Sequence, residues 1–298
     1  MKSYTLNIAA YNIRFESSPD GHELVPSERF LRNISVDAAP DIIIKVHSGT
    51  YDLPSDAVRV FHAPYVEEID GIRVQHRTNF WSIWKHSSDL YIRTIFPLSS
   101  SEKNGVLKFS LSSREWDLWI DSGDKEIDPF EYPLDGLILY YLTVINGDIM
   151  IHSSGVNYSG KGYLFTGVSG KGKSTMANLW ENEGAFVIHD DRLILRKSAG
   201  AFTMYNTPVY KNDEPRESPL NKVFIIEHGY ENRIVPVRGA VAVSLVMANC
   251  IQHNWGHGNI SGLIDALSSL FDIIPAYKLS FLPDKSVIDH ILKNEGKT

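Results

Sequence analysis

Gly167-Val168-Ser169-Gly170-Lys171-Gly172-Lys173-Ser174-Thr175 is the stretch that decides the fold of this 298-residue chain. Its first eight residues read G-x-x-x-x-G-K-[ST], the pattern of a phosphate-binding loop. The apolar run at 162–166 predicts a buried strand before it, and apolar residues at helical spacing over 176–180 predict a helix after it. The alternative is a glycine-rich turn that matches by chance, but a strand and a helix in register on either side favour the phosphate-binding loop.

The loop predicts binding of ATP and Mg²⁺. Backbone N–H groups of a glycine-rich loop and the N-terminus of the helix that follows form a site for anions. We expect Lys173 to reach the β- and γ-phosphates and the Ser174 hydroxyl to ligate Mg²⁺. The residues predicted to bind the nucleotide are Gly167, Val168, Ser169, Gly170, Lys171, Gly172, Lys173, Ser174 and Thr175.

Composition limits the class of protein. The net charge is −7 and the isoelectric point is about 5.9, which argues against a broad nucleic-acid surface. The single cysteine, Cys250, stands in an apolar context and predicts a buried thiol without a disulfide. The first residues lack the apolar region of a signal peptide, and no apolar run is long enough to span a bilayer. We therefore expect a cytoplasmic protein with no membrane partner.

The first part of the chain, 1–125, predicts a smaller β-rich domain. Its aromatic content is explained by packing across a twisted sheet, although a ligand platform is the alternative. No group of residues typical of a catalytic or metal site stands out in this part. Alternation of apolar and polar residues between turn signals predicts strands at 4–9, 11–15, 41–46, 80–84, 90–95, 106–111 and 116–120.

The second part, 126–298, predicts an α/β domain with a mixed sheet. Asp128 and Pro129 are expected to open a helix as its N-cap and first residue, and Asn146-Gly147 to end it. His152 is expected to close a strand over 149–152, followed by a turn and a second strand over 153–158. Further strands are expected at 185–191, 193–196, 202–205, 222–228 and 276–281, and helices at 239–251, 260–272 and from Pro283.

Two adjacent acids, Asp190 and Asp191, end the strand predicted at 185–191. Phosphoryl transfer needs Mg²⁺ ligands and a carboxylate that accepts the proton of the acceptor hydroxyl. Adjacent side chains that leave a strand point in opposite directions, so one acid can face the metal and the other the acceptor. A solvated strand end is the alternative, but the position beside a phosphate-binding loop favours a functional role.

These residues together resemble a known family. His152, Gly160-x-Gly162, the loop at 166–174 and Asp190-Asp191-Arg192 are similar to the catalytic core of bacterial HPr serine kinase/phosphorylase. Those kinases resemble the nucleotide-binding part of phosphoenolpyruvate carboxykinase. The resemblance covers about 148–196, continues more weakly over 200–290 and does not reach 1–125. It implies a P-loop kinase domain of the HPr kinase C-terminal and carboxykinase-like fold.

The resemblance also implies roles for single residues. Asp191 corresponds to the general base, His152 to the catalytic histidine and Lys173 to the phosphate contact. Ser174 and Asp190 correspond to groups at the metal. Thr175 differs from the family, which has an acid there, and the family's downstream signature has no match here.

The function expected is an ATP-dependent kinase that transfers the γ-phosphoryl group to a serine-type hydroxyl of a protein, peptide or small molecule. The alternative is a nucleotide-binding regulatory or scaffold protein with weak catalysis, which the missing downstream signature favours. A carboxykinase-like enzyme would need a second metal-ligand set and an arginine pair that the sequence does not display. Members of the family form hexamers, so the resemblance also allows a homo-oligomer here. The stretch from His253 to Gly258 either lines a substrate pocket or is a loop with two solvated histidines.

Overall fold

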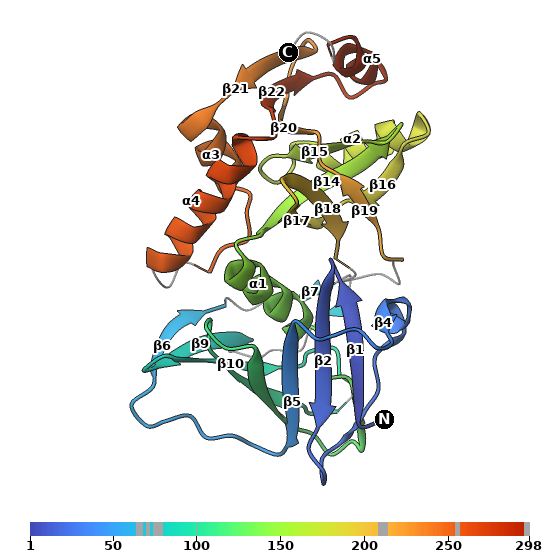
Figure 1. Cartoon of the computed structure of the whole chain (residues 1–298). Coiled ribbons are helices and arrows are strands. Elements are labelled where there is room, and N and C mark those ends of the chain that lie inside the picture. The colour runs from blue at the N-terminus through green and yellow to red at the C-terminus, as the bar shows by residue number, and fades with distance from the viewer. Residues whose placement is uncertain are drawn as a thin grey trace. The chain divides into compact units, whose positions relative to one another are not determined.

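The computed structural model describes residues 1–63, 68–69, 72–73, 80–99, 101–207, 214–253 and 257–294, without the side chains at 68, 69, 72, 73 and 257. These residues form two compact units (Figure 1). The first unit runs to Ile145 and includes Glu214 and His253, and the second unit contains the other described residues. No helix in the described ranges is both long and apolar enough to cross a membrane.

The first unit is built on a mixed sheet of nine strands, counted over its described residues, in the order β4-β1-β2-β5-β12-β11-β10-β9-β6. Strand β5 is parallel to β2 and to β12, and the other neighbours are antiparallel. The strands are β1 Ser3–Ile8, β2 Tyr11–Ser17, β4 Ile34–Ser35, β5 Ile42–Ser48, β6 Val58–His62, β9 Trp81–His86, β10 Asp89–Ile95, β11 Asn104–Phe109 and β12 Glu115–Asp121. The seven strands that the sequence predicted in this part are all present.

Short elements complete this unit. The 3-10 helix η1 follows strand β3, which pairs in parallel with β13. Strands β7 and β8 pair antiparallel and precede β9 in the chain. None of these elements was predicted: the two-residue strands are too short to show periodicity, and the six residues of η1 are fewer than a periodicity window needs. Their bounds are β3 Glu23–Leu24, η1 Glu28–Asn33, β7 Glu68–Ile69, β8 Ile72–Arg73 and β13 Glu126–Ile127.

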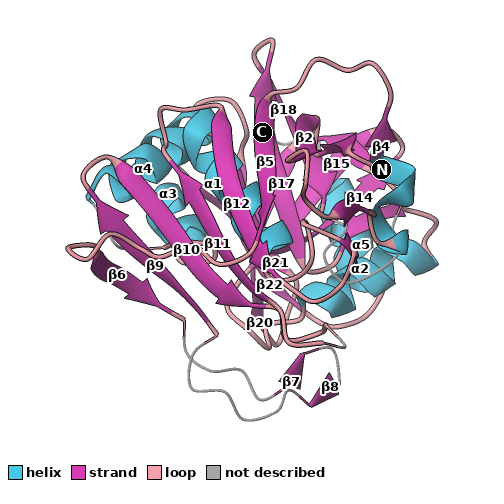
Figure 2. Cartoon of the chain, turned by 90° about the horizontal axis from the view of Figure 1, so that it is seen from below, coloured by secondary structure: helices cyan, strands magenta, loops and turns pink. Residues whose placement is uncertain are grey.

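Helix α1, Leu134–Asn146, packs on one face of this sheet (Figure 2). Alternation decides which face is covered: Ile42, Ile44 and Val46 of β5 are buried, whereas the residues between them are more exposed. The ring centroids of Phe109 and Tyr141 lie 4.5 Å apart, so strand β11 and the helix share one core.

The predicted start of this helix is wrong. The Asp128 carboxylate accepts the Phe130 N–H at 2.8 Å and so caps a turn, and the helix begins only at Leu134. Tyr132 precedes Pro133, and a residue before proline is disfavoured in the α region. The first compact unit also extends to Ile145, beyond the boundary predicted near residue 125. Whether 126–298 folds alone stays a prediction.

The second unit contains another mixed sheet, in the order β19-β18-β17-β14-β15-β20-β22-β21, with β16 paired to β14. Strands β15, β20 and β22 are mutually parallel, so their C-terminal ends meet at one edge. The bounds are β14 Ile149–Tyr158, β15 Lys161–Thr166, β16 Phe186–His189, β17 Arg192–Ser198, β18 Ala201–Asn206, β19 Glu217–Pro219, β20 Lys222–His228, β21 Arg233–Val237 and β22 Ala276–Phe281.

Helices cover both faces of this second sheet (Figure 1). Helices α3, Gly239–Met247, and α4, His257–Phe271, pack on one face, where Ala242 and Leu267 are buried. Helices α2, Lys173–Asn182, and α5, Ser286–Lys293, pack on the other, where Trp180 and Ile288 are buried. The chain is therefore a mixed α/β protein with two mixed sheets, as the sequence indicated.

Strand β14 corrects one prediction. A turn and a separate second strand were expected over 153–158, but β14 continues without a break to Tyr158. Ser153 and Ser154 are fully buried, and the strand changes partner there: its first half pairs with β17 and its second half with β15 and β16. His152 consequently lies inside the strand instead of closing it. Small polar residues within a central strand resemble a turn signal, because only their burial in the sheet distinguishes them.

Cys250 is a free, buried thiol, as predicted. It follows helix α3 instead of lying within a helix, and it forms an isolated bridge with Ile151. Burial raises the pKa of its thiol to about 12, so the unreactive protonated form is favoured at neutral pH.

Candidate nucleotide-binding and phosphoryl-transfer site

The glycine-rich loop joins the end of β15 to the start of α2, so the strand and helix expected around it are present. Gly170 and Gly172 have φ of +78° and +90°, a region that side chains disfavour. A Cβ on Gly167 would lie 2.9 Å from the Ile226 carbonyl oxygen. Glycine at these positions lets the loop turn tightly beside the sheet and present backbone N–H groups at the helix N-terminus.

Lys173, the first residue of α2, is directed back into the loop. Its Nζ donates to the Gly167 carbonyl oxygen at 2.9 Å, and the side chain is buried. Burial lowers the pKa of Lys173, and the negative charges of Asp191 and Asp190 oppose this shift. The two carboxylates therefore act electrostatically on this ammonium. Ser174 in the first turn of the helix is exposed, so its hydroxyl is accessible to a ligand.

Two aromatic rings support the loop from the neighbouring parallel strands. His228 ends β20, and its Nε2–H donates to the Gly170 carbonyl oxygen at 3.0 Å. Phe281 ends β22, and its ring stacks with His228 at a centroid distance of 5.8 Å. A Cβ on Gly172 would lie 2.9 Å from the Phe281 ring. Neither residue was predicted, and the only signal in the sequence was that each ends a predicted strand.

His152 and Asp191 lie together across β14 and β17. Backbone pairing sets His152 opposite Arg192, and the Ser153 N–H donates to the Asp191 carbonyl oxygen at 3.0 Å. The His152 Nε2 is 3.3 Å from Asp191 Oδ1, and the Arg192 Nε is 3.5 Å from Asp191 Oδ2. Burial, followed by the positive charge of Lys173, lowers the pKa of His152, while Asp191 opposes the shift. The neutral imidazole is thus favoured at neutral pH.

The turn that carries the two acids is held by His189. The Nδ1 of this residue accepts the Asp191 N–H at 3.0 Å and the Arg192 N–H at 3.2 Å. The ring therefore occupies the place of a carbonyl acceptor between β16 and β17. Asp190 in this turn is exposed, whereas the Asp191 side chain is about one-third exposed. The sequence analysis did not single out His189, because a histidine at a strand end has no local signature.

Among the described residues, no group of three or more His, Cys, Asp or Glu side chains is placed to hold a metal ion. The predicted ligands, Ser174 and Asp190, are one hydroxyl and one carboxylate. This donor set fits Mg²⁺, which commonly takes one or two protein oxygens and completes its shell with water and substrate phosphates.

The predicted pocket around His253 is not supported by the described residues. His253 is buried in the first unit, its ring centroid lies 4.1 Å from that of Tyr140, and its N–H donates to the Tyr140 hydroxyl at 3.1 Å. It is therefore not a solvated loop histidine. Residues 254–256 and the side chain of His257 lie outside the described part.

Comparisons with known proteins give matches among solved structures alone. No protein-family profile matches the sequence, and no curated protein matches it. Among solved structures, the chain is similar to the Hpr(Ser) kinase/phosphatase from Coxiella burnetii, with 13% sequence identity and a TM-score of 0.29. This similarity covers 49% of this chain and 99% of that chain. It indicates a distant structural relationship only.

Proposed function

We propose that this chain is an ATP-dependent phosphotransferase that acts on a hydroxyl-bearing acceptor. The observation that carries the proposal is geometric: the Ser153 N–H donates to the Asp191 carbonyl oxygen at 3.0 Å, and the Ser154 hydroxyl donates to the Lys173 carbonyl oxygen at 2.9 Å. The lysine expected to contact phosphate and the candidate general base therefore adjoin neighbouring residues of one strand, which supports a single site. The pairing of Asp191 with a histidine of depressed pKa supports a chemical role, because shifted pKa values cluster at functional sites.

Nucleotide binding would use the loop and Lys173. In the free protein the Lys173 ammonium donates to the Gly167 carbonyl oxygen. On binding, we expect this ammonium to exchange that neutral acceptor for the β- and γ-phosphate oxygens, since charged acceptors form stronger hydrogen bonds. Ser174 and Asp190 would hold Mg²⁺, which neutralises developing charge on the phosphates.

The acceptor would be activated by Asp191. Its carboxylate takes the proton of the acceptor hydroxyl as that oxygen forms a bond to the γ-phosphorus, and the bond to the bridging oxygen breaks to release ADP. The Nε2 of His152 lies 3.3 Å from Asp191 Oδ1, and from there the imidazole would orient the carboxylate. His189 fixes the backbone of the same turn through two N–H donors. The acceptor is a serine-type hydroxyl on a protein, a peptide or a small molecule.

The test is ADP formation from Mg²⁺-ATP with three kinds of acceptor: water, free serine and a mixture of serine-containing peptides. We expect wild-type protein to form ADP and to label at least one acceptor. The Asp191→Asn variant should bind nucleotide and fail to label the acceptor. Nucleotide binding by wild type with no ADP formed from any acceptor would contradict the proposal and favour a regulatory nucleotide-binding protein.

A further inference from the structure

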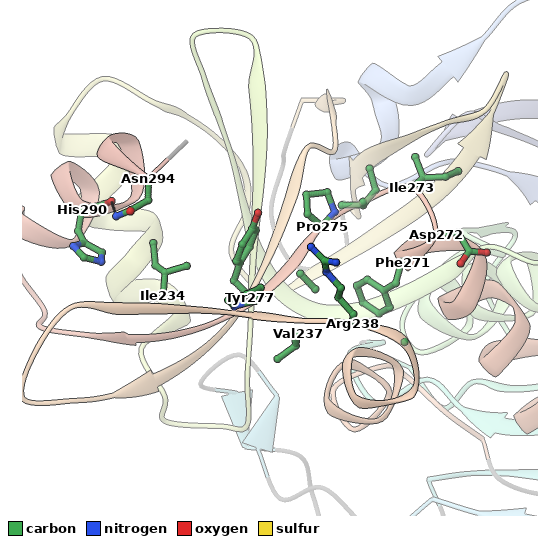
Figure 3. Close-up of a pocket in the computed structure, with 14 residues that line it drawn as sticks. Ile234, Val237, Arg238, Phe271, Asp272, Ile273, Pro275, Tyr277, His290 and Asn294 are labelled. Atoms are coloured by element: carbon green, nitrogen blue, oxygen red, sulfur yellow. Dashed lines mark hydrogen bonds between the residues drawn. The ribbon is translucent and has the colours of Figure 1, made fainter. Parts of the chain in front are cut away.

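A cavity of about 720 Å³ lies in the second unit at the end of the sheet away from the glycine-rich loop (Figure 3). It is lined by the end of β21, the start of β22, helix α5 and the segment after α4. Tyr277 lies in the cavity wall near the start of β22, and Phe281 ends the same strand beneath Gly172. At about 3.3 Å per residue, the four steps between them span about 13 Å. The cavity is therefore separate from the proposed phosphoryl-transfer site.

The Tyr277 hydroxyl has no hydrogen-bond partner among the described residues, although only 5% of the residue is exposed. A buried polar group without a partner costs free energy, and such groups are uncommon. The ring is fixed by stacking on Phe224 at 5.6 Å and by the Lys222 ammonium 5.7 Å from its centroid. The fold thus holds an unsatisfied donor in the wall of a cavity of small-molecule size.

Arg238 supplies positive charge to the same cavity. It precedes helix α3, is exposed, and forms no ion pair or hydrogen bond within the described part of the chain. Figure 3 shows the Arg238 and Tyr277 side chains extending to the same side of the β21–β22 pair. Across the cavity, α5 contributes His290 and Asn294. These polar groups match an anionic head with several acceptor oxygens.

The rest of the cavity wall indicates what the uncharged part of the ligand is. Ile234, Val237 and Phe271 provide an apolar surface for a hydrocarbon or aromatic body. Asp272 also lines the cavity, and its negative charge disfavours a ligand with two negative charges. One guanidinium and one neutral hydroxyl donor therefore suit a single carboxylate better than a phosphate dianion.

We propose that this cavity is a second ligand site, which binds a small monocarboxylate with an apolar or aromatic body. The carboxylate accepts hydrogen bonds from the Arg238 guanidinium and the Tyr277 hydroxyl, and the body packs on the apolar wall. This inference does not depend on the proposed kinase activity, because the cavity and the glycine-rich loop share no residue.

The test is titration of the full chain with 3-phenylpropanoate by calorimetry, with the neutral 3-phenylpropanamide as the matched ligand. We expect Arg238→Gln to raise the Kd about 10-fold or more, because a hydrogen bond to a charged group is lost. Tyr277→Phe should raise the Kd for 3-phenylpropanoate about 3- to 10-fold. The control is Arg233→Gln at the other end of β21, since Arg233 is exposed and outside the lining, and the Kd of this variant should match that of wild type.

A second measurement separates binding from folding. Because Tyr277 has no hydroxyl partner in the free protein, Tyr277→Phe should keep or raise the melting temperature while reducing the shift caused by 3-phenylpropanoate. A lower melting temperature of ligand-free Tyr277→Phe would overturn the assignment of an unsatisfied donor. The proposal is also overturned if wild type shows no binding at about 10 mM probe, if the amide binds as tightly, or if Arg238→Gln binds like wild type.

Discussion

The Nε2 of His152 lies 3.3 Å from Oδ1 of Asp191. The two residues belong to segments far apart in the chain, and antiparallel pairing of β14 with β17 brings them together. Lys173 is coupled electrostatically to this pair: burial and then the positive charge of Lys173 lower the pKa of His152, and the negative charge of Asp191 opposes the lowering of the Lys173 pKa by burial. These three residues are the centre of the proposed site, and the first two predictions test them.

Lys173→Ala should lose most of the rise in melting temperature that Mg²⁺-ATP produces in wild-type protein. Ligand that binds only the folded state stabilises it, by about 2.7 kcal/mol at a concentration of 100 Kd. The substitution removes the ammonium expected to contact the phosphates. Lys278→Ala is the control, because Lys278 is an exposed lysine of β22 in the same unit. Equal shifts in wild type and Lys173→Ala would argue against a working phosphate-binding loop.

Asp191→Asn should retain nucleotide binding and lose phosphoryl transfer by roughly 10²- to 10⁴-fold, the usual contribution of a general base. Asn preserves the size of the side chain and removes its negative charge and basic oxygen. Asp190→Asn should instead raise the Mg²⁺ concentration needed for half-maximal activity. Transfer rates and Mg²⁺ titrations on both variants distinguish the roles. If only Asp190→Asn is inactive at saturating Mg²⁺, the two roles are exchanged.

His253 should make folding stability depend on pH. Burial lowers its pKa from 6.5 to about 4, so the unfolded chain binds the proton more readily than the folded chain. His253 therefore leaves the free energy of unfolding unchanged above pH 6.5. As the pH drops from 6.5 towards 4, the free energy of unfolding falls by at most about 1.4 kcal/mol per pH unit.

Denaturant unfolding of wild type and His253→Phe at several pH values checks this. The variant keeps an aromatic ring and cannot bind the proton, so its stability should change less between pH 6.5 and 4. Parallel pH profiles for the two proteins would show that His253 is accessible to protons in the folded state.

Gly162→Ala should destabilise the second unit. A Cβ at this position would lie 1.8 Å from the Pro219 carbonyl oxygen, so the backbone must move. Overpacking of this kind costs about 1–3 kcal/mol. Gly262→Ala is the matched control, since it lies within helix α4 and its Cβ would meet nothing within 4 Å. We expect the control to be neutral or stabilising by about 0.5–1 kcal/mol. If thermal unfolding shows no loss of stability in Gly162→Ala, the close approach of Gly162 to the Pro219 carbonyl oxygen is contradicted.

Local patterns were sufficient for much of the fold. Alternating residues predicted the main strands of the first unit, and the glycine-rich loop with its flanking strand and helix was predicted from one continuous stretch. Lys173 could be assigned from the loop pattern alone, because that pattern spans only a few residues on either side of it. The start of α1 was mispredicted, because Asp128 and Pro129 form an acceptable cap locally, whereas Tyr132 and Pro133 delay the helix to Leu134.

By itself, the sequence determined the elements and the residue types of the candidate site, because periodicity, glycine conformations and the loop pattern act over short stretches of chain. Only the tertiary structure decided which strands pair. That pairing sets His152 beside Asp191, positions His228 and Phe281 under the glycine-rich loop, and buries His253 among tyrosines. The physical reason is that such contacts join distant segments, and their free energy depends on the burial and chain closure of the whole unit instead of on any local preference.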